Sequence, residues 1–521
     1  MNSALYTPPA ESIRAVIEHF AASQPEQVFV QFPETGEQLT YAELLAELRT
    51  YAGYFAALDV QQGDTISFMM GNGKTTLLLF LASLYAGCVS SPLNPAAGPD
   101  QIEYVLDHSD TKIVFTSEAF QAQVEAAGRQ VSRNVSVVMC DVDKGPVWPE
   151  GTVASEAIET AVKQNDDGLL MYTSGTTGRP KGVILTHKNL LAGGMNTAVA
   201  HELSTSDRAL CVLPLCHINA QCVTVMAPLA SGGSLVMPHS FSVSSFWSWV
   251  VHHQVSWFSV VPTIISYLMH NEGPLNGDVL KQALKDVKFG RSASAALPPA
   301  LHAGFEEKFG IPIVETMGLT ETSAQILSNP MPPKANKYGS PGVAFGTEIK
   351  VIDKQGNEQP HGEEGELMVR GDCVMRCYYK NPEASAEALE NDGWLHTGDL
   401  ARQDEEGFIF ITGRLKELII KGGENIAPRE IDDVLYSHPK VIEAGAVGVD
   451  DEHYGQEVVA CVVTRESANV SADELIDFCR DKLGKIKTPK QIFFFDDLPK
   501  GPSGKVQRLK LVDQLKARQS I

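Results

Sequence analysis

The chain has 521 residues, of which 43% are hydrophobic and 20% are charged, and its formal net charge is -22. A chain of this length exceeds one hydrophobic core, so we expect a soluble globular protein with two or more domains. The acidic balance argues against nonspecific binding to nucleic acid or anionic membranes, although a local group of lysines can still bind an anionic ligand.

The sequence carries no sign of a membrane or secreted protein. No apolar run reaches the length that spans a membrane, and residues 1–9 lack the basic and apolar regions of a secretory signal. The nine cysteines are an odd number in mostly apolar surroundings, which suits a reducing compartment. We therefore expect a cytoplasmic protein.

Three cysteines and a histidine lie close together in the sequence as candidate metal ligands: Cys211, Cys216, His217 and Cys222. Their spacing does not match the C-x2-C pairs of zinc sites. We interpret the cysteines as buried thiols that pack like small apolar side chains.

Residues 10–110 alternate between helical and strand patterns, which predicts βαβ units and a parallel sheet. Thr40 reads as the N-cap of a helix, and an apolar helix is expected over 75–85. Strands are expected over 64–70 and 89–94. The order of these elements indicates an α/β fold.

A possible P-loop lies at residues 71–76, Gly-Asn-Gly-Lys-Thr-Thr, between a predicted strand and a predicted helix. The full motif needs a glycine five residues before Gly73, where this chain has Phe68. We therefore interpret Lys74 as part of an ordinary helix start. A P-loop ATPase or kinase is the alternative, and ATP turnover to ADP would reveal it.

The richest stretch is 171–182, Met-Tyr-Thr-Ser-Gly-Thr-Thr-Gly-Arg-Pro-Lys-Gly, which lies between two apolar segments. Its glycines let backbone N–H groups approach an anion closely, and its hydroxyls and Lys181 add further donors. We predict a hairpin tip that binds a triphosphate. The alternative is a polar surface turn that binds no ligand.

Farther along the chain, predicted strands run into polar turns or loops, except at 256–267, where the strand is followed by a helix. These segments lie at 210–221, 256–267, 287–298 and 313–321. From Tyr338 the sequence changes to short strands and glycine-rich turns, which predicts a β-rich subdomain that includes a loop at 392–399. After Arg414 we expect a small α+β domain with strands at 417–420, 443–449 and 457–463 and helices at 428–437 and 472–482.

Five motifs in this order resemble those of the adenylate-forming superfamily of acyl-CoA synthetases, adenylation domains and luciferases. They are 172–182, Glu-Thr-Met-Gly-Leu-Thr-Glu at 315–321, Trp-Leu-His-Thr-Gly-Asp at 394–399, Gly-Arg-Leu-Lys-Glu at 413–417 and Pro-Ser-Gly-Lys at 502–505. The resemblance covers nearly the whole chain. It implies a large N-terminal domain of parallel α/β sheets with a β-rich subdomain, residues 1–413, and a small mobile C-terminal α+β lid domain, residues 414–521.

The resemblance also implies a reaction in two halves. A carboxylate attacks the α-phosphate of ATP and gives an acyl-adenylate and pyrophosphate; a thiol, usually coenzyme A, then attacks the acyl carbon and releases AMP. ATP, Mg²⁺ and coenzyme A are therefore the expected cofactors and co-substrates. The protein would contribute mainly positioning and charge neutralisation.

The resemblance assigns roles to individual residues of the nucleotide site. The β- and γ-phosphates would be bound by the loop residues Thr173, Ser174, Gly175, Thr176, Thr177, Gly178 and Lys181. Thr320 would donate to the α-phosphate, Glu321 would hold Mg²⁺, and Lys505 would bridge the substrate carboxylate and the α-phosphate. The ribose and adenine would be contacted by Asp399, Arg414, Ser294, Glu315 and Met317.

Two segments depart from the family pattern. Met317 stands where many relatives have an aromatic residue, although its polarizable sulfur can pack on a flat ring. Ala293 and Ser294 stand where the family usually has glycines, which could tighten the adjoining pocket. Neither change touches the phosphate chemistry.

The C-terminal domain would move between the two half-reactions. Lys416 lies where the family hinges, and Gly422 and Gly423 would line the approach of the thiol. A side chain at Gly423 would narrow a pantetheine tunnel.

The acid substrate is predicted from a polar pocket of His217, Asn219, Gln221 and Arg291. The run 213–222 resembles the carnitine/crotonobetaine-CoA ligase branch and its small-acid relatives. We expect a short polar or charged acid, such as a betaine, a dicarboxylate or a sulfonated acetate. A buried Arg291 would favour a second anionic group, whereas its alternative is an ion pair with a structural carboxylate.

Other functions remain open at this stage. A free-standing adenylation enzyme could load a carrier protein or an amine instead of coenzyme A. A noncatalytic binding protein or a luciferase-like oxygenase would keep the same scaffold. The oligomeric state is also open, with a homodimer as the candidate.

Overall fold

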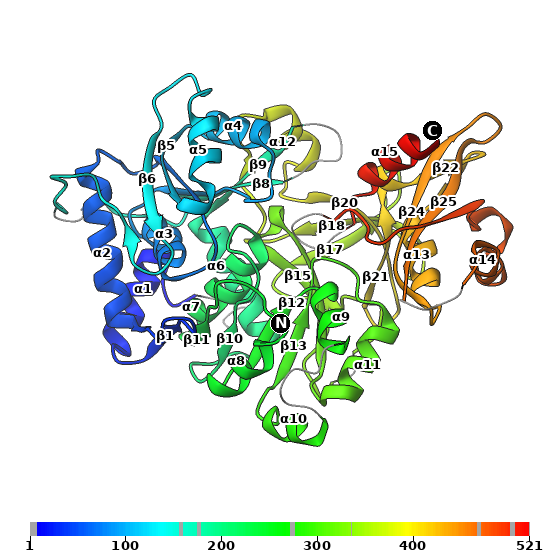
Figure 1. The fold of residues 1–521 in the computed structure, drawn as a ribbon, viewed down its shortest axis with the longest axis horizontal. Coiled ribbons are helices and arrows are strands. Elements are labelled where there is room, and N and C mark those ends of the chain that lie inside the picture. The colour runs from blue at the N-terminus through cyan, green and yellow to red at the C-terminus, as the bar shows by residue number, and fades with distance from the viewer. Residues whose placement is uncertain are drawn as a thin grey trace.

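The computed structural model describes residues 8–155, 160–173, 179–270, 277–334, 336–465, 470–500 and 506–519. These residues form two large sheets of nine and eight strands, a four-stranded sheet and a five-stranded sheet. In Figure 1 the first part of the chain lies to the left and the C-terminal residues lie to the right. No helix among these described ranges is both long and apolar enough to cross a membrane.

The eight-stranded sheet has a parallel centre, as the strand–helix alternation predicts. Its spatial order is β19-β9-β8-β4-β3-β5-β6-β7. The strands are β3 (Thr65–Met69), β4 (Val89–Pro92), β5 (Thr111–Ser117), β6 (Ser136–Asp141), β7 (Gly145–Pro146), β8 (Asp167–Thr173), β9 (Lys181–Thr186) and β19 (Cys377–Tyr378). β8 and β9 form the predicted hairpin, and β19 pairs with β9 although it lies almost two hundred residues later in the chain.

The nine-stranded sheet carries the other half of the large domain in the order β16-β15-β14-β13-β12-β10-β11-β1-β2. Its strands are β1 (Val28–Gln31), β2 (Gln38–Thr40), β10 (Arg208–Leu210), β11 (Ser234–Val236), β12 (Trp257–Val260), β13 (Phe289–Ser292), β14 (Ile313–Leu319), β15 (Ala324–Ser328) and β16 (Val343–Ala344). β12, β13 and β14 are parallel, so their carboxyl ends open on the same edge.

The helices begin where the sequence provides caps. Thr40 and Glu43 form a capping box at α2 (Tyr41–Ala57), and Thr186 with Asn189 forms another at α6 (His187–Ala200). α3 (Lys74–Tyr85) is buried at every position after Lys74, which explains its mostly apolar sequence. The hydroxyls of its buried Thr75, Thr76 and Ser83 donate to backbone carbonyl oxygens. Ile66, Leu81 and Leu190 belong to one apolar core that joins both large sheets.

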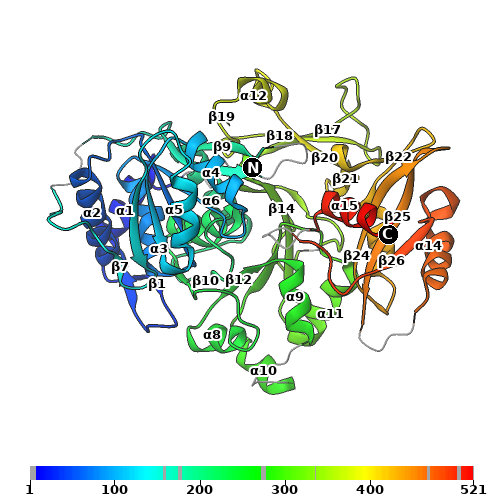
Figure 2. The same cartoon turned by 45° about the horizontal axis from the view of Figure 1, so that its top comes forward.

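The remaining helices of the large domain cover the sheets or fill their connections. They are α1 (Ile13–Ser23), α4 (Pro99–His108), α5 (Gln121–Gly128), α7 (Ala227–Ser231), α8 (Phe246–His252), α9 (Pro262–His270), α10 (Gly277–Ala283), α11 (Pro299–Phe309) and α12 (Pro382–Ala388). Figure 2 shows α12 and β19 next to β9 at the top of the molecule.

The β-rich subdomain is an antiparallel sheet of β17 (Glu348–Ile352), β18 (Gly365–Arg370), β20 (Leu395–Gln403) and β21 (Ile409–Arg414). One expectation is wrong here. The segment 392–399 is not a loop throughout, because β20 begins at Leu395 and pairs with β18 and β21. The polar sequence of this segment does not look like a strand, and its strand structure depends on pairing with β18 and β21.

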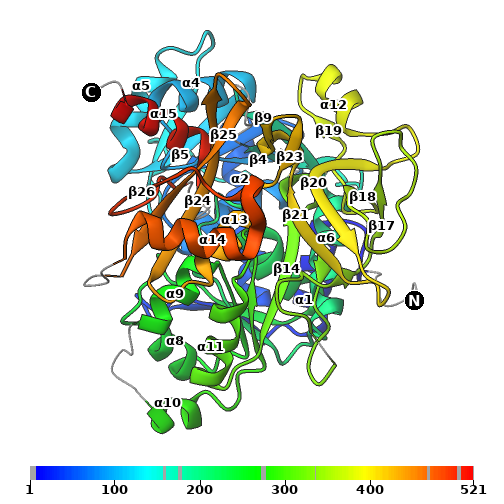
Figure 3. The same cartoon turned by 90° about the vertical axis from the view of Figure 1, so that its right-hand side faces the viewer.

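The last part of the chain forms its own sheet of β22 (Ile419–Lys421), β23 (Glu424–Ile426), β24 (Val441–Asp451), β25 (Gly455–Thr464) and β26 (Gln491–Phe494), with α13 (Pro428–Tyr436), α14 (Ala472–Lys487) and α15 (Arg508–Gln519). Figure 3 shows this unit in front of the rest. Its core around Ile431 and Leu475 is separate from the main core.

Two boundaries differ from the sequence expectation. The strand expected over 417–420 begins only at Ile419, because residues 415–417 form a short 3₁₀ helix. After β10 ends at Leu210, the chain does not continue as a strand but enters a π-helix over Asn219–Met226. A π-helix has no distinctive hydrophobic period, so the pattern could not predict it.

Candidate active site

The predicted phosphate-binding hairpin places Thr173 and Lys181 opposite each other. They are paired residues at the ends of β8 and β9, and Thr173 Oγ1 lies 3.5 Å from the Lys181 carbonyl oxygen. The five residues of the tip, Ser174, Gly175, Thr176, Thr177 and Gly178, lie outside the described residues. The described strands therefore end, at Thr173 and Lys181, at the carboxyl edge of the parallel part of the sheet.

The segment after β14 is a tight turn that carries Thr320 and Glu321. A Cβ at Gly318 would stand 1.5 Å from the Ala324 carbonyl oxygen, so only glycine fits there. The Thr322 hydroxyl accepts from the Leu319 N–H and donates to the Ala324 carbonyl oxygen. This network holds Thr320 and Glu321 at the end of the parallel strands, where α/β sheets commonly bind ligands.

Tyr378 of β19, which was not predicted from the sequence, connects that turn with the hairpin. Its hydroxyl donates to Glu321 Oε1 at 2.9 Å, and the Lys181 ammonium lies 4.7 Å from the centre of its ring. Burial, together with the neighbouring Glu321, raises the pKa of Tyr378. No local signal marks Tyr378, because its partners come from segments far away in the sequence.

Asp399 and Arg414 face each other across β20 and β21. Arg414 Nε donates to Asp399 Oδ1 at 2.6 Å, and Asp399 is 3% exposed. Burial lowers the pKa of Arg414, but Asp399, Glu417 and Glu321 outweigh that effect and raise it. The carboxylate expected to accept from the ribose therefore already has an arginine partner, which orients it.

The residues expected around adenine lie on adjacent strands. Ser292 of β13 pairs with Glu315 of β14, and Glu315 Oε1 accepts from the Leu297 N–H at 3.0 Å. Glu315 is 2% exposed, and burial raises its pKa although the Leu297 hydrogen bond opposes this. Glu315 thus fixes the loop that follows β13. Ser294 of that loop is exposed with a φ of 70°, and Met317 is half-buried.

Arg291 is the most unusual side chain near this loop. It is 1% exposed, yet its hydrogen-bond acceptors are neutral: Gln325 Oε1, Asn219 Oδ1 and Ser259 Oγ, each at 3.2 Å. Burial lowers the pKa of Arg291 to about 9. No carboxylate within the described ranges pairs with it, so the alternative of a structural ion pair has no support there.

Asn219 links this buried arginine to the exposed side of the loop. Its Oδ1 accepts from Arg291 and from Ser259, while its Nδ2 donates to Ser294 Oγ at 3.4 Å. Of the four residues predicted for the acid pocket, Asn219 and Arg291 are therefore in contact. Gln325 and Ser259 were missed, because isolated polar residues in apolar strands give no pattern.

The other two predicted pocket residues have different surroundings. Gln221 is fully buried and its Nε2 donates to the Leu215 carbonyl oxygen at 2.7 Å, which stabilises the turn before the π-helix. Burial lowers the pKa of His217, whose Nε2 has no hydrogen-bond partner in the described parts of the chain. Within the described ranges, neither side chain makes a hydrogen bond to Arg291.

The residues predicted to form the hinge and to border the thiol lie at the start of the C-terminal unit. Lys416 is exposed in the short 3₁₀ helix. Gly422 and Gly423 form the two-residue turn between β22 and β23 with φ values of 60° and 88°. Such a turn requires left-handed backbone at both positions, which is a reason for glycine apart from any tunnel. Among the described residues, leaving out its chain neighbours, no atom would lie within 4 Å of a Cβ at Gly423.

The P-loop alternative receives no support from the geometry of Lys74. Its ammonium pairs with Glu37 at 3.2 Å and with Glu47 at 3.6 Å. Asn72 bonds to the backbone of Leu213 and Leu215, so this loop braces the turn after β10.

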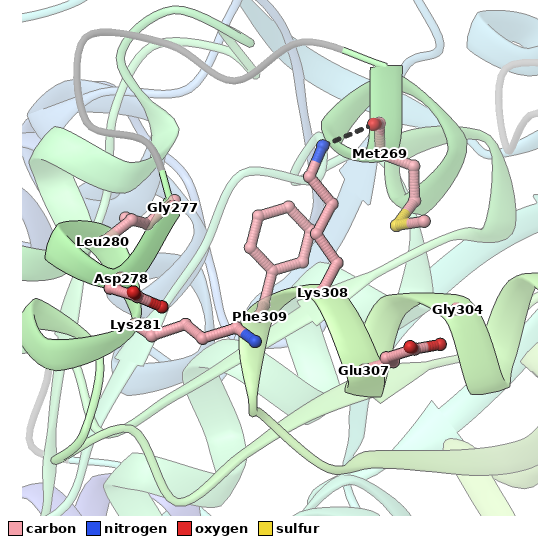
Figure 4. A pocket seen from close by; sticks show the side chains of 9 residues that line it. All are labelled: Met269, Gly277, Asp278, Leu280, Lys281, Gly304, Glu307, Lys308 and Phe309. Carbon is pink, nitrogen blue, oxygen red and sulfur yellow. Dashed lines mark hydrogen bonds between the residues drawn. The ribbon is translucent and has the colours of Figure 1, made fainter.

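A surface pocket of about 520 Å³ lies elsewhere, between α9, α10 and α11. Figure 4 shows Lys308 donating to the Met269 carbonyl oxygen at its rim, with Asp278, Lys281 and Glu307 around it. None of the predicted site residues lines this pocket. Lys181, Glu321 and Asp399 therefore lie apart from it, on or beside strands of the eight-, nine- and four-stranded sheets.

Two further points concern residues named from the sequence. Lys505 lies outside the described residues. In the part of the chain that the structure describes, no group of three or more His, Cys, Asp or Glu side chains could hold a metal ion, and the thiols of Cys211, Cys216 and Cys222 are free.

Two family models match the chain. The model described as AMP-binding enzyme matches residues 17–379, and the model described as AMP-binding enzyme C-terminal domain matches residues 430–505. The first match alone spans more than half of the chain.

Individual relatives are similar over nearly their full length. A sulfoacetate–CoA ligase of Cupriavidus necator is 45% identical over 515 residues, which cover 98% of this chain and 100% of the relative. An oxalate–CoA ligase of Arabidopsis thaliana is 35% identical over 458 residues, which cover 86% of this chain and 88% of the relative. The ATP-bound crystal structure of MatB from Rhodopseudomonas palustris has a TM-score of 0.87 at 28% identity, with coverage of 97% and 99%.

Proposed function

The chain belongs to the AMP-binding enzyme family and is an AMP-forming acyl-CoA synthetase, and we propose that its substrate is a short acid with a second anionic group. The observation that carries this proposal is the buried Arg291, whose acceptors are all neutral. The similarity to ligases named for sulfoacetate and oxalate, both short acids of this kind, supports it.

A buried guanidinium without a carboxylate is costly, and proteins keep such a group where a ligand completes it. Arg291 Nη2 makes no hydrogen bond to a described residue. A sulfonate or second carboxylate could accept from Nη2 and neutralise the charge. The reacting carboxylate would then lie toward Ser294 and the nucleotide, on the side to which Asn219 leads.

The remaining site residues would act on the nucleotide by binding and orientation. Lys181 and the hairpin tip would hold the phosphates, Thr320 would donate to the α-phosphate, and Asp399 with Arg414 would orient the ribose. Lys505 would approach the α-phosphate during adenylation, and Gly422 and Gly423 would border the thiol during the second half-reaction. Rotation of residues 414–521 about Lys416 would exchange the two arrangements.

The donor set suits Mg²⁺. Magnesium is commonly bound by one or two carboxylates together with substrate phosphates and water. Glu321 Oε1 accepts a hydrogen bond from the Tyr378 hydroxyl, and Oε2 accepts no hydrogen bond from a described residue. That oxygen would hold the ion, which neutralises phosphate charge when bound. A cytoplasmic location and a homodimer complete the proposal, and sedimentation of the purified protein tests the latter.

The direct test is a substrate panel of sulfoacetate, oxalate, malonate, acetate, butyrate and octanoate with ATP and Mg²⁺. We expect pyrophosphate release with the acids that carry two anionic groups, and AMP with thioester only after coenzyme A is added. Turnover that is equal for acetate, or that grows beyond about eight carbons, contradicts the substrate class. Release without thioester indicates a carrier-protein or amine acceptor, and ADP contradicts the adenylation chemistry.

A further inference from the structure

Tyr378 touches two side chains that carry opposite charges in the nucleotide site. Its hydroxyl donates to Glu321 Oε1 at 2.9 Å, and the Lys181 ammonium stands 4.7 Å from its ring centre. Tyr378 itself is 9% exposed, so the protein holds the ring in place. One side chain therefore contacts the proposed metal ligand and the proposed phosphate cation together.

The backbone beside Tyr378 makes the same connection. The Met375 N–H donates to the Glu321 carbonyl oxygen, and the Tyr379 N–H donates to the Gly182 carbonyl oxygen, both at 2.7 Å. Tyr378 also pairs with Val183 in the sheet. The segment is thus anchored to the turn on one side and to β9 on the other, which fixes where the phenol points.

The two charged groups contact different parts of Tyr378: the Lys181 ammonium lies over its ring, and Glu321 accepts from its hydroxyl. An ammonium and a carboxylate that paired directly would neutralise each other. An aromatic face attracts an ammonium without neutralising it, and a phenol donates to a carboxylate without removing its charge. Lys181 forms no ion pair with a residue in the described ranges.

We propose that Tyr378 is a positioning residue that keeps Lys181 available to the phosphates and Glu321 available to Mg²⁺. This inference rests on the proposed function, because it takes the nucleotide roles of these two residues from there. It adds to that function a residue that couples the phosphate hairpin to the turn after β14. We expect the Tyr378 hydroxyl to affect the part of nucleotide binding that requires Mg²⁺. Its removal should therefore raise the Mg²⁺ concentration that binding needs.

The test is calorimetric binding of an ATP analogue with a methylene group between the α- and β-phosphates, measured over a range of Mg²⁺ concentrations. We expect Tyr378→Phe, which keeps the ring, to raise the half-saturating Mg²⁺ concentration about tenfold, as loss of one hydrogen bond to a charged group does. Tyr378→Leu should in addition weaken analogue binding without Mg²⁺, because Lys181 loses the ring.

Tyr379→Phe is the matched control. Its hydroxyl also donates to a carboxylate, Asp110 Oδ2 at 2.8 Å, but on the side away from Glu321. We expect this variant to bind the analogue as the unaltered protein does. Melting temperatures without ligand identify any variant that fails to fold. If Tyr378→Leu fails to fold, the Mg²⁺ dependence of Tyr378→Phe is the test of the positioning role.

A double-substitution cycle separates positioning from a general structural effect. In a Glu321→Gln background, Tyr378→Phe should change the Mg²⁺ dependence no further. The inference is overturned if Tyr378→Phe binds the analogue like the unaltered protein. It is also overturned if Tyr378→Phe raises the half-saturating Mg²⁺ concentration by the same factor with Glu321 present and in the Glu321→Gln background. If the unaltered protein itself fails to bind the analogue with Mg²⁺, the proposed function fails instead.

Discussion

At the scale of single residues, Arg291 is the side chain whose environment says most about the substrate. Its three acceptors are an amide oxygen from Asn219, another from Gln325 and a hydroxyl from Ser259. Neutral acceptors orient a guanidinium but leave its positive charge uncompensated in a buried position. Selection for stability alone would favour a carboxylate or an apolar residue there.

Arg291→Met is therefore expected to separate the two kinds of acid. The KM for a dianionic acid should rise about a hundredfold, because one partner of a buried charge pair is lost, while the KM for acetate should change little. Steady-state kinetics with both acids measure the ratio. Arg208→Met, which removes a half-buried arginine from the same sheet, should leave that ratio unchanged. An equal rise for acetate would contradict the role of Arg291 in selecting a second anionic group.

At the scale of elements, the site is made of strand ends and the turns that follow them. The hairpin of β8 and β9, the turn after β14 and the pair of β20 with β21 each contribute polar side chains. Hydrophobic runs followed by glycines and hydroxyls identified the first two. The third was hidden, because β20 looks like a loop until β18 and β21 pair with it.

The turn between β22 and β23 offers a prediction at this scale. Gly423→Leu is expected to retain acid-dependent pyrophosphate release but to lose thioester formation, because a long side chain would fill the path of the thiol. The left-handed φ of 88° adds a backbone cost of about 1 kcal/mol, which stability measurements must separate from function. Single-turnover assays of each half-reaction, with acid and ATP and then with coenzyme A, provide the measurement.

The control for this variant is Gly356→Leu. Gly356 has a φ of 85° and open space around it, so the substitution imposes the same strain far from the thiol path. We expect it to keep both half-reactions. Equal loss of both half-reactions in Gly423→Leu would refute the assignment of this turn to the second step.

At the scale of the whole molecule, protonation of buried histidines should lower the free energy of unfolding at mildly acidic pH. His187 is fully buried, and burial lowers its pKa from about 6.5 to about 4. Burial also lowers the pKa values of His201 and His217. The unfolded chain therefore binds protons at a pH where the folded chain does not, so stability is lost as the pH falls.

For His187 alone, the free energy of unfolding should decrease by about 1.4 kcal/mol per pH unit between roughly pH 6.5 and pH 4. Denaturant unfolding at pH 7.5 and at pH 5.5 measures this loss. His187→Gln should reduce the difference in the free energy of unfolding between these two pH values by about 1.4 kcal/mol. A pH dependence that is the same in His187→Gln and in the unaltered protein would contradict this account.

The division of the chain into two units is also a property of the whole molecule. The main apolar core ends with residues of β21, and a separate core begins at Ile419. The passage between them contains Lys416 and the short 3₁₀ helix. The boundary at residues 413 and 414 stays a prediction, as does rotation about Lys416.

The sequence by itself determined the family to which the chain belongs, because the motifs that mark it are local runs. It also predicted a phosphate-binding hairpin, since phosphate binding needs glycines, hydroxyls and lysine in one local run. It also determined the strand–helix alternation and the helix starts, since caps and hydrophobic periods are local. The tertiary structure alone decided that Arg291 pairs with no carboxylate among the described residues, that Asp399 accepts from Arg414, and that Tyr378 contacts both Lys181 and Glu321. Each of these depends on contacts between segments that are distant in the chain, and such contacts leave no local pattern.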